Sequence, residues 1–176
     1  MTGAGITTER LRGERPRRDH AALYAQLFGS DAVAATLWPP PHGGARSPEQ
    51  AHELLAQDVA HWDSEGFGPW LFFEAGTARF AGHAGLRCGT VGGAPSVEVL
   101  YAVSPDRWGR GYASEMALAA VDRARTIGLP GVVGYTLTTN HASRRVLEKA
   151  GLRFERTLEH AGLPHWFGRL SFAQIS

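Results

Sequence analysis

Apolar side chains recur every three or four residues in several segments of the chain, and this spacing predicts amphipathic helices. The best marked begins where Ser47 and Gln50 match a capping box and Pro48 occupies the first turn. A loop over 38–44 precedes it, because three consecutive prolines there cannot donate the backbone bonds of a helix. The predicted helices are a short one capped by Asp19 and continuing through Leu23, Leu27 and Phe28, and longer ones over 47–66, 111–127 and 142–150.

Alternating or β-branched apolar runs between these helices predict strands. The predicted strands are 6–11, 70–74, 80–88, 96–103, 132–138, 154–158 and 166–170. Short turns join the second, third and fourth of them, one turn being Gly92-Gly93, which indicates an antiparallel meander. A strand–helix–strand order follows, as in a βαβ crossover. We therefore expect an α/β (α+β) fold, with a mixed, mostly antiparallel sheet of about seven strands flanked by about four helices.

Length and composition limit the classes of protein to which this chain can belong. With 176 residues, 43% of them hydrophobic, residues 1–176 are expected to form a single domain. A net charge of +1 argues against a nucleic-acid partner and against an anionic membrane surface. No run approaches 18 apolar residues, so no membrane-spanning helix is expected, and the arginines near the start lack the apolar run of a secretory signal. These observations predict a cytoplasmic protein.

The single cysteine, Cys88, cannot form an intramolecular disulfide and lies in a strand with apolar neighbours, so we expect a buried structural thiol. His52 and Glu53 begin like the helix of a zinc protease, but the second histidine is missing. The other histidines show no ligand spacing. No metal site is therefore predicted.

The turn between the fourth predicted strand and the next helix carries the clearest chemical signal. Gly109 and Gly111 let the backbone approach a ligand at a helix N-terminus, where unpaired amides and the helix dipole favour phosphate oxygens. Arg107 and Arg110 add positive charge beside them. A Walker A loop would need a lysine that is absent, and a dinucleotide turn would need a carboxylate on the following strand, which has none. The turn therefore favours a ligand that carries a diphosphate.

Several motifs resemble the GNAT superfamily of acyl-CoA-dependent N-acyltransferases, whose cofactor motif reads Gln/Arg-x-x-Gly-x-Gly/Ala. The segment Trp108-Gly109-Arg110-Gly111-Tyr112-Ala113 matches it except at Trp108, and this variant is similar to that of the ribosomal-protein N-terminal acetyltransferases. Asn140 and Ser143 match the family's Asn-x-x-Ser element. The strand Val97-Glu98-Val99-Leu100-Tyr101 is similar to its Glu-Ile-Gly-Tyr strand, with Leu100 in place of glycine. The resemblance covers nearly the whole chain.

The resemblance implies acetyl-CoA as co-substrate and a GNAT-like sheet that splays open between its fourth and fifth strands. The pantetheine arm would lie in this opening, because an unpaired strand edge is a template for an amide-rich chain. The implied cofactor-binding residues are Tyr101, Ala102, Val103, Arg107, Trp108, Gly109, Arg110, Gly111, Tyr112, Ala113, Asn140 and Ser143.

For catalysis, an alkylammonium must lose a proton before its nitrogen attacks a thioester. Glu98 is the predicted general base; alternatively it binds a cationic acceptor or pairs with an arginine. Ser143 is the predicted proton donor to the leaving thiolate, or a cap of the helix that follows. Asn140 either contacts pantetheine or caps the same helix. The backbone N–H near Val103 is the predicted oxyanion donor.

The acceptor pocket implied by the resemblance lies between the loop 38–44, the helix that bears Trp62 and the late strands near His165 and Trp166. Trp38, Trp166 and Glu98 are its predicted substrate-binding residues; the alternative for either tryptophan is packing. Tyr135 is read as a packing residue. The predicted acceptor is a protein N-terminus or a small-molecule amine, and the chain is expected to be a monomer or homodimer. The alternative function is a non-catalytic acyl-CoA-binding module.

Overall fold

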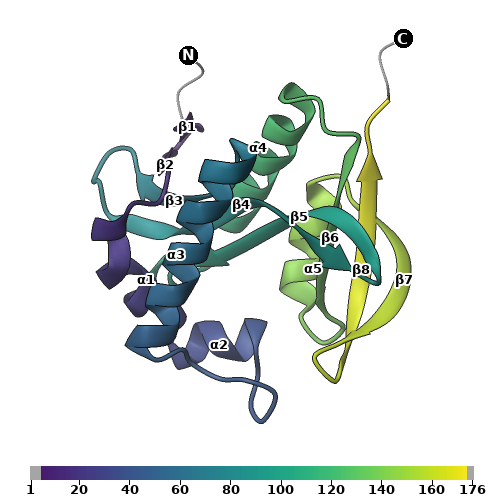
Figure 1. The fold of residues 1–176 in the computed structure, drawn as a ribbon, viewed down its shortest axis with the longest axis horizontal. Helices are drawn as coiled ribbons and strands as arrows, with labels where there is room; N and C mark the ends of the chain where they lie inside the picture. The colour runs from purple at the N-terminus through teal and green to yellow at the C-terminus, as the bar shows by residue number, and fades with distance from the viewer. Residues whose placement is uncertain (1–4, 174–176) are drawn as a thin grey trace.

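The computed structural model describes residues 5–173, which build one eight-stranded sheet in the order β1-β2-β3-β4-β5-β6-β8-β7 (Figure 1). All neighbouring strands are antiparallel except β5 and β6, which run parallel. The strands are β1 Ile6–Thr7, β2 Leu11–Glu14, β3 Pro69–Glu74, β4 Phe80–Val91, β5 Ala94–Val103, β6 Gly131–Leu137, β7 Arg153–His160 and β8 Leu163–Ser171. The predicted class, a mixed and mostly antiparallel sheet, is confirmed.

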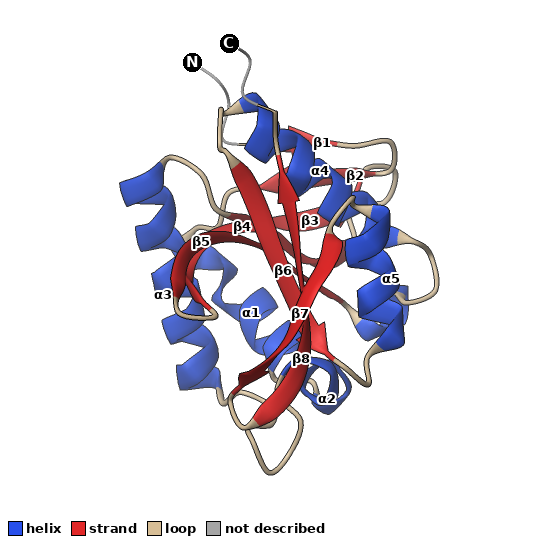
Figure 2. Cartoon of the chain, turned by 90° about the vertical axis from the view of Figure 1, so that its right-hand side faces the viewer, coloured by secondary structure: helices blue, strands red, loops and turns tan. Residues whose placement is uncertain are grey.

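Helices cover both faces of the sheet, with α1 and α3 on one side and α4 and α5 on the other (Figure 2). The α-helices are α1 Ala21–Phe28, α2 Asp31–Leu37, α3 Pro48–Glu65, α4 Tyr112–Thr126 and α5 His141–Lys149. On the first side, Tyr24 and Leu55 pack with Leu71 and Ala102 of the sheet. On the other side, helix residues such as Val121 and Leu147 pack against the opposite faces of the same strands. Each central strand is therefore buried on both faces.

The long helix α3 begins and ends as its sequence predicts. The Ser47 amide donates to Gln50 Oε1 at 2.9 Å, and the Gln50 amide donates to Ser47 Oγ at 3.2 Å. Gly66 ends the helix with φ of +73°, a left-handed conformation that glycine adopts without strain. Asp58 and Trp62 of this helix are buried, so an acidic side chain lies in its apolar stripe.

Three local predictions were wrong, and one helix was not predicted. The segment 6–11 forms two short strands paired with each other, because the chain turns between them. Asp19 caps no α-helix, since it lies in a 3-10 helix over Arg18–His20. The helix α2 was not predicted, although Ser30 caps it by accepting from the Val33 amide. Cys88 is exposed, because β4 extends beyond the core into a hairpin with β5.

The β4–β5 hairpin keeps one register from Gly82 opposite Val103 to Val91 opposite Ala94. Leu100 is thus accommodated without a bulge in this pairing. By contrast, β5 and β6 meet at the single register pair Glu98 and Val133. This confirms the splay between the fourth and fifth predicted strands, which are β5 and β6. No helix within residues 5–173 is long and apolar enough to cross a membrane.

Candidate active site

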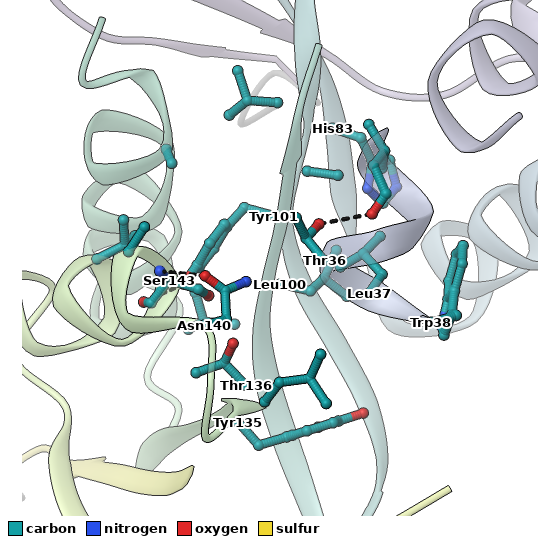
Figure 3. Close-up of a pocket in the computed structure, with 18 of the residues that line it drawn as sticks. Thr36, Leu37, Trp38, His83, Leu100, Tyr101, Tyr135, Thr136, Asn140 and Ser143 are labelled. Atoms are coloured by element: carbon teal, nitrogen blue, oxygen red, sulfur yellow. Dashed lines mark hydrogen bonds between the residues drawn. The ribbon is translucent and has the colours of Figure 1, made fainter. Parts of the chain in front are cut away.

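A cavity of about 550 Å³ lies at the opening between β5 and β6. Figure 3 shows Asn140 and Ser143 on one side of β5 and Trp38 on the other, with Tyr101 pointing toward Ser143. The cavity thus has two ends. One, called here the cofactor end, is lined by residues of α4, α5 and the turn before α4; the other, called the acceptor end, is lined by residues of α1 to α3, β4 and β8, among them Phe28, Trp38, Asp58, His83, Arg87 and His165.

The backbone of β5 offers unpaired groups to this opening. Ser104 donates its amide to the Ala81 carbonyl on the β4 side. Backbone groups of an antiparallel ladder alternate in direction, so those of Ala102 also face β4, whereas those of Tyr101 and Val103 face the opening. The indole of Trp108 donates to the Val103 carbonyl at 2.8 Å. Among residues 5–173, the Tyr101 N–H and C=O and the Val103 N–H therefore remain for a ligand, and the Ala102 backbone does not.

The turn before α4 has the geometry of an anion cradle. Gly109 and Gly111 have φ of +76° and +79°, and a Cβ at Gly109 would meet no atom within 4 Å. Gly111 caps α4, so the first amides of the helix have no carbonyl partner within it. Within residues 5–173, the amides of 109–114 donate no hydrogen bond to a side chain or backbone carbonyl. Open space and unpaired donors coincide at this turn, which is where the sequence places a phosphate site.

Acidic and basic side chains that sequence reasoning missed hold this turn in place. Arg10 donates to the Arg110 carbonyl at 2.9 Å and to Glu115 of α4 at 2.7 Å. The buried Glu74 of β3 accepts from the Tyr112 hydroxyl at 2.9 Å and lies 3.2 Å from Arg107 Nε. These partners are far apart in sequence, so the sequence shows that they are charged but not that they meet at this turn.

The two arginines predicted to face the phosphates differ in exposure. The Arg107 side chain is buried between Glu74 and Asp106, so its charge is already compensated. The Arg110 side chain is exposed and lies 3.4 Å from Glu74. Arg110 therefore has more freedom to reach a bound anion than Arg107 has.

The start of α5 joins the cofactor end through Asn140, Ser143 and Tyr101. Asn140 Oδ1 accepts from the Ser143 amide at 3.1 Å, so Asn140 caps the helix and its side-chain amide still has N–H groups to donate. Ser143 does not cap. Its hydroxyl lies 2.8 Å from the Tyr101 hydroxyl, which also donates to the Ser143 carbonyl at 2.8 Å. Sequence reasoning had assigned Tyr101 only a backbone role.

Glu98 is partly buried in the wall of the cavity, on β5 directly opposite Arg87 of β4. No hydrogen bond to its carboxylate occurs among residues 5–173. Burial raises the pKa of Glu98 to about 7, although the nearby Arg87 charge acts in the opposite direction. A carboxylate with such a pKa exchanges a proton readily near neutral pH, as a general base must.

A buried network lies beneath the acceptor end. Asp58 accepts from the Tyr24 hydroxyl at 2.6 Å, contacts His83 Nε2 at 2.7 Å and accepts from Arg87 at 2.5 Å. Burial opposes ionisation of Asp58, but His83 and Arg87 outweigh it, so the pKa of Asp58 is lowered. Asp58 is 1% exposed, so it acts as a fixed anion that compensates Arg87. An acid within the apolar stripe of α3 was the sequence signal that could have revealed this network.

Only one of the two tryptophans predicted to bind the acceptor lines the cavity. Trp38 lines the cavity and stacks beneath the Arg46 guanidinium, 3.9 Å from its ring centre. Trp166 does not line it and is 3% exposed in the core on the other face of the sheet, so its prediction as a substrate-binding residue was wrong. Its neighbour His165 faces the cavity instead, because successive strand residues point to opposite faces.

Tyr135, read from the sequence as a packing residue, also lines the cavity. Burial, and then the Glu98 charge, raises its pKa. Its ring contacts those of His160 and His165, with centres 5.0 and 5.6 Å apart. Among residues 5–173, no group of three or more histidine, cysteine or acidic side chains is arranged to hold a metal ion.

Comparisons with known proteins agree with this geometry. The chain is 26% identical to the uncharacterised protein YkkB of Bacillus subtilis over 161 residues, which are 90% of this chain and 91% of that protein. It is 37% identical to the FsC-acetyl coenzyme A-N(2)-transacetylase of Aspergillus fumigatus over 99 residues, but these are only 52% of this chain and 41% of that protein.

The fold is similar to that of RimL, a ribosomal L7/L12 alpha-N-protein acetyltransferase solved in complex with coenzyme A. The TM-score is 0.75 at 17% identity, covering 95% of this chain and 97% of RimL. The family model of the acetyltransferase (GNAT) domain matches residues 10–153, most of the chain. The chain therefore belongs to the GNAT acetyltransferase family.

Proposed function

We propose that this protein transfers the acetyl group of acetyl-CoA to a primary amine, by direct attack of the amine in a ternary complex. The observation that carries the proposal is that the unpaired amides of the turn before α4 and the open edge of β5 border one cavity, which also contains Glu98. The turn amides can hold the diphosphate of a nucleotide, and the open edge of β5 can hold the arm that carries the thioester. Glu98 can take the proton that an amine acceptor must lose.

Independently of family membership, several backbone and side-chain groups of this chain are placed to bind acetyl-CoA. The diphosphate would lie against the amides of 109–114 and near Arg110, where a side chain at Gly109 or Gly111 would stand in the way. The pantetheine amides would pair with the Tyr101 and Val103 backbone. Asn140 has an N–H group left to donate to the same arm. When bound, acetyl-CoA supplies the activated acyl group.

In the proposed reaction, Glu98 accepts a proton from the acceptor ammonium, directly or through a water. The amine nitrogen then bonds to the acetyl carbon, and the bond from that carbon to sulfur breaks. The nitrogen loses its second proton as the amide forms, and through water this proton replaces the one that Ser143 gives to sulfur. The Val103 N–H faces the opening and would donate to the oxygen on which negative charge develops. Ser143 would protonate the departing thiolate, although a thiol with a pKa near 8.5 leaves tolerably without an acid.

The acceptor is proposed to be a small-molecule amine or a protein N-terminus, and the protein to act as a monomer or homodimer in the cytoplasm. The test measures acetyl-CoA binding by calorimetry and thiol release with a panel of primary amines. We expect micromolar binding and amine-dependent release. Tight binding without release on any amine would favour a non-catalytic acyl-CoA-binding module, and absence of binding would contradict both functions.

A further inference from the structure

The acidic and basic side chains at the acceptor end of the cavity are unequally engaged. Asp58, His83, Arg87 and Glu98 line this end. Arg87 and His83 are both bonded to the buried Asp58. Among residues 5–173, no side chain donates a hydrogen bond to the Glu98 carboxylate. An ionised Glu98 therefore attracts a cation and repels an anion at this end.

Arg87 is poorly placed to bind an acceptor carboxylate as well. One of its nitrogens is held by Asp58, and Glu98 lies directly across from it on β5. A third carboxylate beside Asp58 and Glu98 would face like charge in a partly dehydrated cavity, which costs far more than in water. Of the two buried histidines at this end, His83 is engaged with Asp58 through Nε2, and burial lowers the pKa of His165.

Much of the remaining lining of the acceptor end is apolar or aromatic, beside polar residues such as Thr36 and Thr136. The apolar and aromatic lining includes Phe28, Leu37, Trp38, Leu100 and Tyr135, and Figure 3 shows the last four of these. Trp38 is fixed on its outer side by Arg46 and packs beside Phe28, with ring centres 5.9 Å apart. Such a lining favours a ligand body that loses little hydration on entry.

We infer that the acceptor is a primary monoamine with a compact apolar or aromatic body and no carboxylate next to the amine. This inference rests on the proposed function and adds to it the class of acceptor. The amine faces Glu98, and the body contacts Trp38 and Phe28. Amino acids, which carry a carboxylate beside the amine, are excluded because Glu98 repels that carboxylate and Arg87 is already bonded to Asp58.

The test compares three acceptors with the same phenyl body: 2-phenylethylamine, L-phenylalanine and L-phenylalaninamide, each corrected for its unprotonated fraction. We expect kcat/KM for 2-phenylethylamine to exceed that for phenylalanine by at least about ten-fold, with the amide between them. Equal or faster turnover of phenylalanine would overturn the inference. So would a preference for a diamine such as putrescine, or for a peptide N-terminus.

A second arm uses Asp58→Asn, which leaves the Arg87 charge uncompensated. The preference for 2-phenylethylamine over phenylalanine should fall at least about five-fold, because Arg87 then attracts the carboxylate. An unchanged ratio in a folded variant would contradict the inference; if the variant does not fold, the wild-type ratio decides. A protein that binds acetyl-CoA but acetylates no amine refutes the proposed function itself, whereas acetylation with the opposite preference refutes only the acceptor class.

Discussion

The hydroxyls of Tyr101 on β5 and Ser143 on α5 lie 2.8 Å apart across the opening of the sheet. Tyr101 also donates to the Ser143 carbonyl, so its hydroxyl contacts Ser143 at two atoms. Burial raises the pKa of Tyr101, which the hydrogen bond to Ser143 offsets only in part, so the phenol stays protonated at neutral pH. The two hydroxyls therefore form one unit at the cofactor end.

Replacing either hydroxyl should slow the reaction without much loss of acetyl-CoA affinity. We expect Tyr101→Phe and Ser143→Ala each to lower kcat roughly ten-fold, because both disturb the same proton donor. The double variant should be hardly slower than Ser143→Ala alone, since residues that act as a unit are not additive. Steady-state kinetics of the four proteins test this. Multiplying losses would show that the two hydroxyls act independently.

Glu98 should determine the pH dependence of the rate. Because burial raises its pKa to about 7, kcat/KM of the wild type should rise with pH up to about 7 and then level off, in addition to the titration of the amine itself. Glu98→Gln should be about 100-fold slower and lose this inflection, with unchanged acetyl-CoA affinity. The same profile in both proteins would remove Glu98 from the role of base.

The same carboxylate should reduce stability at high pH. Its folded pKa of about 7 lies above the ordinary value of a glutamate, so the folded state binds the proton more tightly than the unfolded state does. Stability from this group is fully present below about pH 4 and is lost as the pH rises to about 7. Glu98→Gln should therefore have a higher melting temperature than the wild type at pH 8. At pH 4 the difference should disappear; a constant difference would contradict the raised pKa.

A valine at Gly111 should prevent acetyl-CoA binding, and Gly128 offers a matched control. The two glycines flank opposite ends of α4 with φ of +79° and +78°, so valine strains the backbone similarly at each. Only Gly111 lies in the proposed phosphate turn. Calorimetry should show at least about 100-fold weaker binding for Gly111→Val and wild-type affinity for Gly128→Val. Equal losses would indicate a general effect on folding instead.

Asp58 should be important for stability. Asp58→Asn should cost about 3 kcal/mol of unfolding free energy at pH 7, because Arg87 and His83 lose a buried charged partner. The lowered pKa of Asp58 means that its contribution is present above about pH 4 and is lost as the pH falls further. Urea unfolding at pH 7 and pH 3 measures both effects. A cost of equal size at the two pH values would show that ionisation of Asp58 does not matter.

Local sequence signals were sufficient for much of the fold. The capping box at Ser47, the glycines that end α3 and α4, and the two-residue turn before β5 act between residues close in the chain. The physical cause lies within a few residues, so the pattern alone predicts the element. The helix α2 was not predicted although Ser30 caps it, because its seven residues are too few for an apolar stripe to repeat.

For the site too, features that depend on neighbouring residues in sequence could be predicted, and features that depend on packing could not. The turn from Trp108 to Ala113 could be predicted because a helix N-terminus and its glycines are adjacent in sequence, whereas the pairing of Asp58 with His83 and Arg87 depends on how α3 packs on β4. Strand parity placed His165 in the cavity and Trp166 in the core, a choice that composition cannot make. The sequence by itself determined the helices other than α2, the sheet class and the glycine turn before α4, because these follow from short-range spacing. Only the tertiary structure decided which charges compensate one another and which side chains share the cavity, because burial and pKa depend on neighbours brought together by packing.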